Sequence, residues 1–128
     1  MTNRMAREFR EKLMSPAEAV KLVKSGDTIY IGTTSSTANV MCAALAGRAD
    51  ELEGLTLTAG IGTVSETALQ KLNPKTFAGI NTCFMGSWER GNRGCVPVDF
   101  TSVHLSQVDI WCTQTAPPDV AFLEVSPP

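Results

Sequence analysis

The chain has 128 residues, 43% of them hydrophobic and 19% charged. That is enough for one ordinary domain with its own core, and it excludes a disordered tail, a collagen-like repeat and a membrane span. Eleven basic and thirteen acidic residues give a formal net charge of -2, so no excess of Lys and Arg is present to neutralise phosphates, and we expect neither a nucleic-acid nor a membrane partner.

The N-terminal segment, residues 2–12, is charged and lacks the apolar stretch of a secretory signal peptide. The cysteines, which are Cys42, Cys83, Cys95 and Cys112, follow no Cys-x-x-Cys spacing. Because secreted disulfide frameworks come with a signal peptide, we expect a cytoplasmic protein whose thiols are reduced and mostly buried as small hydrophobic groups.

A first helix is predicted to begin after Ser15. The motif Ser15-Pro16-Ala17-Glu18 combines an N-cap hydroxyl, a proline at the first helical position and a glutamate three residues after the cap. The helix is expected to end at Ser25-Gly26, because glycine accepts the left-handed conformation. A strand over residues 28–31 follows and ends at Gly32, after which come the hydroxyl residues 33–37.

A second helix is predicted over residues 38–52, and a second strand over residues 55–59, where leucine alternates with threonine. The buried face of the helix is expected to consist of Val40, Met41, Ala44 and Leu45. Gly60-Ile61-Gly62 closes the strand, and residues 65–72 are expected to be helical.

The same alternation continues in the second half of the chain. An apolar strand is predicted over residues 77–85, a glycine- and arginine-rich loop over 86–94 and a short strand over 95–98. Residues 101–112 are typical of a helix, although 108–111 also fit an extended segment. Residues 119–125 are predicted to form a buried strand.

These elements predict an α/β fold with a mainly parallel sheet and helices on both faces, because strands and helices alternate and the strand runs are almost continuously apolar. Ligands of such sheets bind beyond the carboxyl ends of the strands. Those ends carry Gly32 with its hydroxyl run, Gly60 to Gly62, Gly86-Ser87 and Ser126-Pro127.

The loop Gly32-Thr33-Thr34-Ser35-Ser36-Thr37 is the most suggestive of these ends. Hydroxyls and free amides at a helix N-terminus suit a phosphate or a carboxylate, whereas the simpler interpretation is a helix cap with solvated hydroxyls. The sequence Gly60-Ile61-Gly62-Thr63-Val64-Ser65 follows a strand as a dinucleotide-binding loop does. However, Ser65 replaces the third glycine and no acidic residue lies about 20 residues on, so a tight turn is the better interpretation.

His104, Glu124 and the pair of Arg90 and Arg93 each allow a functional and a structural interpretation. His104 fits a polar helix face, although a Cys–His pair formed through the fold stays open; its spacing to the cysteines does not suggest a metal site. Glu124 interrupts the last apolar strand. It is either a catalytic carboxylate or a charge that protects an edge strand from aggregation. Arg90 and Arg93 could clamp a carboxylate or a pyrophosphate. The alternative is that both arginines are solvated and that Glu89 is a local partner.

Several segments resemble the N-terminal half of the acetyl-CoA hydrolase/CoA-transferase family, of the 4-hydroxybutyrate/acetate CoA-transferase type. They are residues 15–27 (SPAEAVKLVKSGD), 43–52 (AALAGRADEL), 96–98 (VPV) and 118–128 (PDVAFLEVSPP). The last is the most specific, because a buried strand that runs into Ser-Pro-Pro is unusual.

The resemblance implies that the chain is the N-terminal domain, residues 1–128, of a protein that continues past its C-terminal end. It implies transfer of coenzyme A between an acyl-CoA and a small carboxylate, through an acyl anhydride and a glutamyl-CoA thioester. That glutamate and a Gly-x-Gly-x-x-Pro loop belong to the missing C-terminal domain. The resemblance then implies no catalytic residue in this chain, with Glu124 as the one alternative candidate.

The expected substrate-binding residues are Gly32, Thr33, Thr34, Ser35, Ser36, Gly60, Gly62, Gly86, Ser87, Arg90, Ser126 and Pro127. No metal and no permanently bound cofactor is expected, since coenzyme A is the substrate. The expected partners are an acyl-CoA, a small carboxylic acid, the C-terminal domain and further copies in a homo-oligomer. Alternatives are an acyl-CoA hydrolase half, a non-catalytic module that binds CoA or a nucleotide-like ligand, and, by fold analogy, a flavodoxin-like or sugar-phosphate enzyme.

Overall fold

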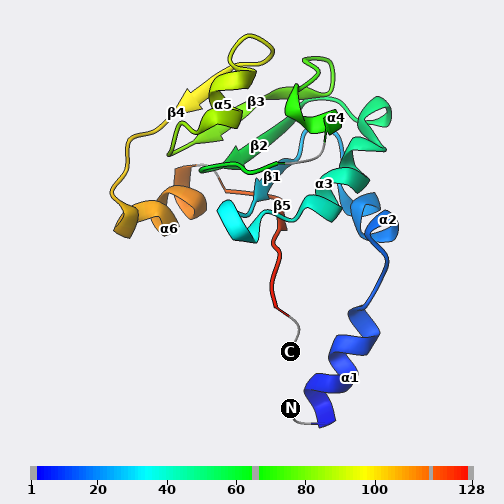
Figure 1. The fold of residues 1–128 in the computed structure, drawn as a ribbon. Coiled ribbons are helices and arrows are strands. Elements are labelled where there is room, and N and C mark those ends of the chain that lie inside the picture. Colours follow the sequence, from blue (N-terminus) through cyan, green and yellow to red (C-terminus); the bar gives the residue numbers. More distant parts are fainter. Residues whose placement is uncertain (1–2, 65–66, 116, 127–128) are drawn as a thin grey trace.

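Five parallel strands form the centre of the computed structural model, which describes residues 3–64, 67–115 and 117–126 (Figure 1). The strands are β1 (Thr28–Ile31), β2 (Leu55–Ala59), β3 (Phe77–Thr82), β4 (Val98–Phe100) and β5 (Val120–Phe122). Their order in the sheet is β4-β3-β2-β1-β5, and each neighbouring pair is parallel. The predicted α/β class with a parallel sheet is confirmed.

The helices of the described residues are short. The α-helices are α1 (Asn3–Lys12), α2 (Pro16–Ala19), α3 (Asn39–Ala46), α4 (Thr67–Gln70), α5 (Ser87–Asn92) and α6 (Val108–Ile110). Single 3-10 turns are η1 (Val20–Leu22), η2 (Thr34–Ser36), η3 (Ala49–Glu51) and η4 (Leu105–Gln107), and a π-helical turn, η5 (Trp111–Thr115), follows α6.

The start of α2 confirms the predicted capping box. The Glu18 amide donates to the Ser15 hydroxyl at 3.3 Å, and the Ser15 amide donates to the Glu18 carboxylate at 2.9 Å. The helical segment ends earlier than predicted, at Leu22 of η1, with Val23 as an extended C-cap; Gly26, with a φ of 86°, lies in the turn that follows.

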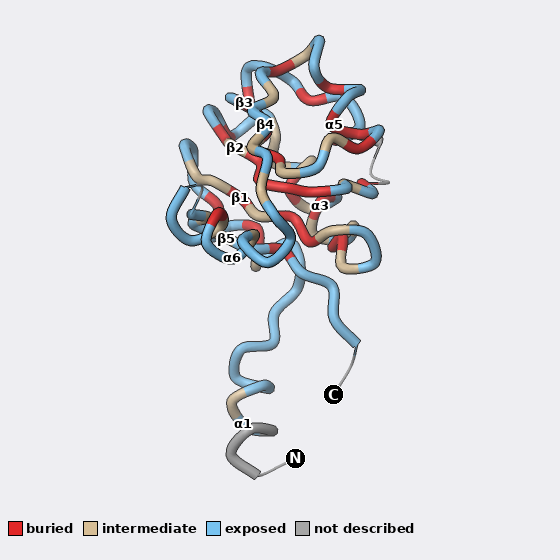
Figure 2. The backbone as a smooth tube through the Cα atoms, turned by 90° about the vertical axis from the view of Figure 1, so that its left-hand side faces the viewer, coloured by how far each residue is buried: buried red, intermediate tan, exposed pale blue. Residues whose placement is uncertain are grey.

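Helices cover both faces of the sheet, as predicted. Figure 2 views the strands nearly end-on, with α3 and α5 on one side and α6 on the other. Alternate side chains of β1 divide between the faces: Ile29 and Ile31 pack in the core, and Tyr30 lies in a cavity beside α6. The chain places β1 to β4 side by side through connections on the α3 face, and it returns past α6 to form β5 next to β1.

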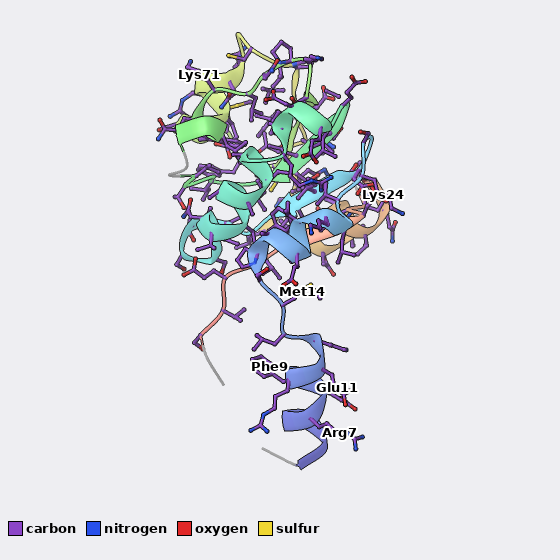
Figure 3. The ribbon with its side chains drawn as sticks, turned by 90° about the vertical axis from the view of Figure 1, so that its right-hand side faces the viewer. Arg7, Phe9, Glu11, Met14, Lys24 and Lys71 are labelled. Atoms are coloured by element: carbon purple, nitrogen blue, oxygen red, sulfur yellow. The ribbon has the colours of Figure 1, made fainter. Side chains whose placement is uncertain are left out.

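The helix α1 extends away from the rest of the molecule (Figure 3). Phe9 on this helix is 49% exposed, and Leu13 just after it is 68% exposed. Arg7 and Glu11, four residues apart, form an exposed ion pair at 3.6 Å. The charges of this segment are visible in the sequence, but no helix was predicted there.

Tertiary packing corrects the predicted buried face of the second helix. Val40 was expected inside, but it is 65% exposed. The helix α3 begins at Asn39, and the residues that face the sheet are Ala38, Cys42 and Leu45, each at most 5% exposed. Their spacing of four and three residues forms a single stripe, which leaves Val40 on the opposite side.

Several predicted boundaries also move. The third strand ends at Thr82, before residue 85, and the short strand is Val98–Phe100 in place of 95–98. The segment 101–112 becomes helical only from Leu105, so an extended 108–111 is wrong. Ser65 and Glu66, at the start of the predicted helix over 65–72, lie outside the described residues; α4 covers Thr67–Gln70.

Two predictions of burial are wrong in part. The last strand is β5 at the sheet edge, where Phe122 is buried but Leu123 is 55% and Val125 80% exposed. Of the four cysteines, only Cys42 is fully buried, whereas Cys83, Cys95 and Cys112 are partly exposed.

Candidate functional site

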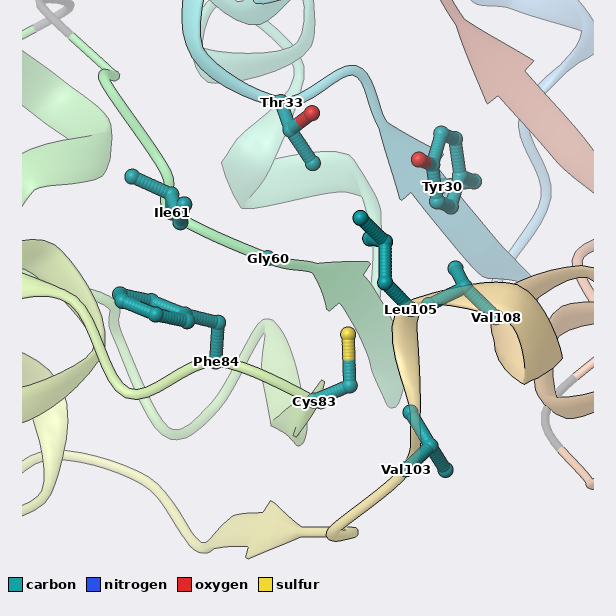
Figure 4. Close-up of a pocket in the computed structure, with 9 residues that line it drawn as sticks. All are labelled: Tyr30, Thr33, Gly60, Ile61, Cys83, Phe84, Val103, Leu105 and Val108. Atoms are coloured by element: carbon teal, nitrogen blue, oxygen red, sulfur yellow. The ribbon is translucent and has the colours of Figure 1, made fainter.

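A cavity of about 280 Å³ lies at the carboxyl ends of β1, β2 and β3 (Figure 4). Its walls come from Tyr30, Thr33, Gly60, Ile61, Cys83, Phe84, Val103, Leu105 and Val108. The lining is mainly apolar and includes no charged side chain. Thr33 and Gly60 were predicted as ligand-binding residues, and the structure brings them to this cavity.

The loop after β1 turns sharply at Gly32. A Cβ at this position would lie 2.2 Å from the Ser36 carbonyl oxygen, so only glycine lets the chain return this closely. The Thr37 hydroxyl donates to the Gly32 carbonyl at 2.9 Å and closes the turn. The predicted hydroxyl run therefore forms a tight 3-10 turn at the rim of the cavity.

Hydrogen bonds join this loop to the Gly60–Thr63 loop after β2. The Thr34 amide donates to the Ile61 carbonyl at 3.3 Å, and the Thr63 hydroxyl donates to the Thr34 carbonyl at 2.8 Å. The Thr37 and Thr63 hydroxyls lie 2.8 Å apart. The carboxyl ends of β1 and β2 thus form one connected rim.

Two residues of this rim have strained backbones. Thr34 has a φ of 47° and Ile61 a φ of 50°. Both are β-branched, and such side chains rarely occupy the left-handed region because Cβ crowds the following carbonyl. Strained residues of this kind concentrate at binding and catalytic sites, where surrounding contacts hold them.

The last strand also reaches the hydroxyl loop. The Gly32 amide donates to the Phe122 carbonyl at 2.9 Å, and the Glu124 amide donates to the Ser36 carbonyl at 3.0 Å. The side chains of Glu124 and Ser126 are exposed. Pro127, which was predicted with Ser126 as a ligand-binding residue after the last strand, lies outside the described residues.

The segment predicted as a glycine- and arginine-rich loop contains the helix α5, so the prediction of a loop is wrong for residues 87–92. Gly86 is its N-cap, and Gly86 packs against Ile61, whose Cα lies 3.5 Å from the Cβ position of that glycine. The exposed Arg90 donates to the Met85 carbonyl and, at 3.3 Å, to the Ser87 hydroxyl. Arg90 and Ser87 therefore bond to their own helix start.

Glu89 is not the local partner of Arg90 that the sequence suggested. Its side chain is completely buried, and one carboxylate oxygen, Oε1, accepts the Gly62 amide hydrogen at 2.8 Å. Sequence reasoning missed this residue because a glutamate beside arginines in a polar segment is typical of a solvated loop.

Burial sets the titration of the polar groups in the cavity. It raises the pKa of the Cys83 thiol, and the nearby Glu89 carboxylate raises it further. Burial also raises the pKa of the Tyr30 phenol, with smaller contributions from Cys112 and Cys83. At neutral pH the cavity therefore presents a protonated thiol and a protonated phenol, and neither is an activated nucleophile.

The sequence did not single out Tyr30, Cys83 or the apolar wall from Val103 to Val108 as site residues. The available signals were a tyrosine within a buried strand and an apolar pair, Leu105 and Val108, three residues apart. His104 is exposed at the start of η4. Across the described ranges, no three His, Cys, Asp or Glu residues are placed to hold a metal ion, and no helix of these ranges is long and apolar enough to cross a lipid bilayer.

Comparison with known proteins gives consistent matches. Residues 1–128 match the model of the acetyl-CoA hydrolase/transferase N-terminal domain. A butyryl-CoA:acetate CoA-transferase from Anaerostipes caccae is 30% identical over 123 residues, which cover 88% of this chain and 28% of that protein.

Solved structures share the fold. The crystal structure of RipA from Yersinia pestis matches with a TM-score of 0.74 and 19% identity, over 93% of this chain and 30% of that one. A RipA variant matches with a TM-score of 0.78 and 23% identity, again over 93% and 30%. The chain therefore spans less than a third of the length of each of these relatives.

Proposed function

Because the chain belongs to the acetyl-CoA hydrolase/CoA-transferase family, which its match over residues 1–128 shows, we propose that it is the N-terminal domain of a CoA-transferase. The cavity at the carboxyl ends of β1 to β3 forms one wall of the transfer site. A C-terminal domain supplies the other wall and the catalytic glutamate. The short span relative to its matches supports a second domain.

In the proposed reaction, the glutamate carboxylate attacks the acyl-CoA thioester and gives a mixed anhydride and a CoA thiolate. The thiolate then attacks the glutamyl carbonyl of the anhydride, which releases the first carboxylate and leaves a glutamyl-CoA thioester. The acceptor carboxylate attacks this thioester, and the same two steps run in reverse to form the new acyl-CoA. The proposal places this reaction in a cytoplasmic homo-oligomer.

The apolar lining of the cavity is the observation that carries this proposal. A lining without charged side chains suits the acyl or pantetheine part of an acyl-CoA better than its phosphates. An apolar wall also keeps water from the anhydride and the thioester, which favours transfer over hydrolysis. The protonated Cys83 thiol does not compete as a nucleophile.

The cavity can be tested with a pair of matched substitutions. Val108→Phe partly fills it, whereas Val40→Phe places the same side chain on an exposed position of α3, away from the cavity. Isothermal titration calorimetry of butyryl-CoA, CoA and short carboxylates would be run on the 128-residue chain and on the longer protein. We expect Val108→Phe to weaken acyl-CoA binding about tenfold, or about 1.4 kcal/mol, and Val40→Phe to leave it unchanged. Equal effects would contradict the assignment.

The catalytic part of the proposal predicts that the isolated chain does not transfer CoA. Robust transfer by the chain alone, abolished by Glu124→Gln, would instead establish a self-contained enzyme. A non-catalytic binding module remains the second candidate, because the titratable groups in the cavity lining, Tyr30 and Cys83, both have raised pKa values. Binding by the short chain together with inactivity of the longer protein would favour that module.

A further inference from the structure

The helix α5 directs three buried side chains at the connection between β2 and β3. They are Trp88, Glu89 and Asn92. The Trp88 indole donates to the Leu69 carbonyl at 3.0 Å, and the Asn92 carboxamide accepts the Leu72 amide hydrogen at 2.8 Å. Glu89 accepts the Gly62 amide hydrogen, and this bond lies nearest the cavity. Each inward side chain thus holds a backbone group of the same connection.

Two glycines make room for the Glu89 carboxylate. A Cβ on Gly86 would lie 2.5 Å from Glu89 Oε2, and a Cβ on Gly62 would lie 3.2 Å from Glu89 Oε1 and 2.8 Å from the Trp88 ring. Real Cβ atoms essentially never approach other atoms as closely as 2.5 or 2.8 Å. A side chain at position 86 would therefore collide with the carboxylate, and one at position 62 would collide with the Trp88 ring and crowd the carboxylate.

The bond from Glu89 acts on a single peptide group. The Gly62 N–H and the Ile61 C=O belong to the same planar unit. Glu89 Oε1 accepts the N–H at 2.8 Å, and the Thr34 amide donates to the C=O at 3.3 Å. With both ends held, the plane cannot turn about the Ile61 Cα–C and Gly62 N–Cα bonds, which fixes the backbone on the carboxyl side of Ile61, a residue with a positive φ.

Stability alone does not favour this arrangement. Glu89 Oε2 is buried with no hydrogen-bond partner among the described residues, which costs folding free energy. Ile61 adds backbone strain and exposes 40% of an apolar side chain at the cavity. Two unfavourable features that meet at one peptide of the rim indicate that the shape of the rim is what they maintain.

We propose that Glu89 is a positioning residue, whose carboxylate clamps the Ile61–Gly62 peptide and so keeps the rim of the cavity in its ligand-binding shape. Glu89 does not touch the ligand in this scheme; it acts through Gly62 and Ile61. The ligand part of the inference rests on the proposed function, whereas the clamp itself is a property of the free chain.

The first test measures the clamp without any ligand. Hydrogen exchange of the Gly62 amide would be followed by NMR in the chain and in the variants Glu89→Ala, Glu89→Gln and, as a control at an exposed glutamate, Glu53→Ala. We expect exchange about tenfold faster in Glu89→Ala. Glu89→Gln, which keeps an acceptor oxygen, and Glu53→Ala should leave it unchanged. An unaltered Gly62 amide in Glu89→Ala would overturn the proposal.

The second test asks whether Glu89 acts through the strained Ile61. Glycine adopts a positive φ without strain, so Ile61→Gly should at least halve the loss of melting temperature that Glu89→Ala causes. Additive losses would overturn the clamp. Should Glu89→Ala alone not fold, the double variant decides: restored cooperative unfolding supports the proposal, and continued failure to fold refutes it.

Calorimetry with butyryl-CoA then separates this inference from the proposed function. We expect Glu89→Ala to weaken binding about tenfold and Glu89→Gln to restore it. Unchanged affinity in Glu89→Ala would refute the positioning role. Absence of butyryl-CoA binding in every protein, including the unaltered chain, would refute the proposed function, and the exchange and unfolding results would still decide the clamp.

Discussion

A substitution of Gly32 tests the tight turn that starts the rim of the cavity. In Gly32→Ala the new Cβ would lie 2.2 Å from the Ser36 carbonyl oxygen and 2.8 Å from its carbonyl carbon, well inside the ordinary contact range of 3.4–4 Å. The obstacle is backbone, so no side-chain rotation relieves it. Moving Ser36 away would break its bond to the Glu124 amide at 3.0 Å.

Overpacking of this kind typically costs about 1–3 kcal/mol, and the backbone clash puts Gly32→Ala near the upper end. At about 3–5 °C per kcal/mol for a chain of this length, we expect the melting temperature to fall by about 8–15 °C. Circular dichroism during thermal unfolding measures this shift.

Gly91→Ala is the matched control. It makes the same chemical change in α5, where a Cβ would meet nothing within 4 Å. Alanine in a helix is favoured over glycine by about 0.5–1 kcal/mol, so the melting temperature should rise by about 2–5 °C. The described turn would be refuted if Gly32→Ala had the same melting temperature as the unaltered chain, or if both variants changed the melting temperature in the same direction.

Three further predictions follow from other contacts. Asn92→Leu should lower the free energy of unfolding by about 2–4 kcal/mol in urea titrations, because the buried carboxamide loses its bond to the Leu72 amide and two bonds to carbonyls; a loss below about 1 kcal/mol would contradict this. Ser15→Ala should cost about 1 kcal/mol of stability by removing the capping box. It should also weaken the loss of stability in acid. The Ser15 hydroxyl is the largest cause that lowers the pKa of Glu18 below 4.5, and the stability it provides is lost as the pH falls through the folded-state pKa. For Cys83 the sign is opposite. Burial raises the pKa of its thiol above 9.0, so stability falls as the pH rises from about 9 towards the folded-state pKa. Cys83→Ala should therefore reduce the fall of the melting temperature with pH in this alkaline range, and an unchanged pH dependence would argue against burial of the thiol.

Much of the fold could be predicted from local patterns. The strands Thr28–Ile31 and Leu55–Ala59 have the predicted bounds, because short apolar runs between turn residues have few alternatives. The capping box at Ser15 was equally clear, since both of its hydrogen bonds form within four residues. The family resemblance also came from local segments in the right order, and the match over residues 1–128 confirms it.

The candidate site was predicted less completely. The topology rule correctly placed Gly32, Thr33 and Gly60 at the carboxyl ends of neighbouring strands. It could not place Leu105 or Val108, because these residues reach the cavity only when the chain returns from β4 to β5 across the other face. It also could not show that Arg90 bonds to its own helix start.

Local sequence patterns specify the order of the elements, their approximate bounds and the parallel sheet, because helix caps, turns and hydrophobic periodicity depend on neighbours within a few residues. The helix at residues 87–92 and the burial of Glu89 depend instead on long-range contacts. A glycine-containing, arginine-rich segment is a weak helix on its own, and α5 is held by bonds from Trp88, Glu89 and Asn92 to the distant backbone of residues 62–72. Those bonds form only when the β2–β3 connection packs against the helix, so no local sequence pattern predicts them.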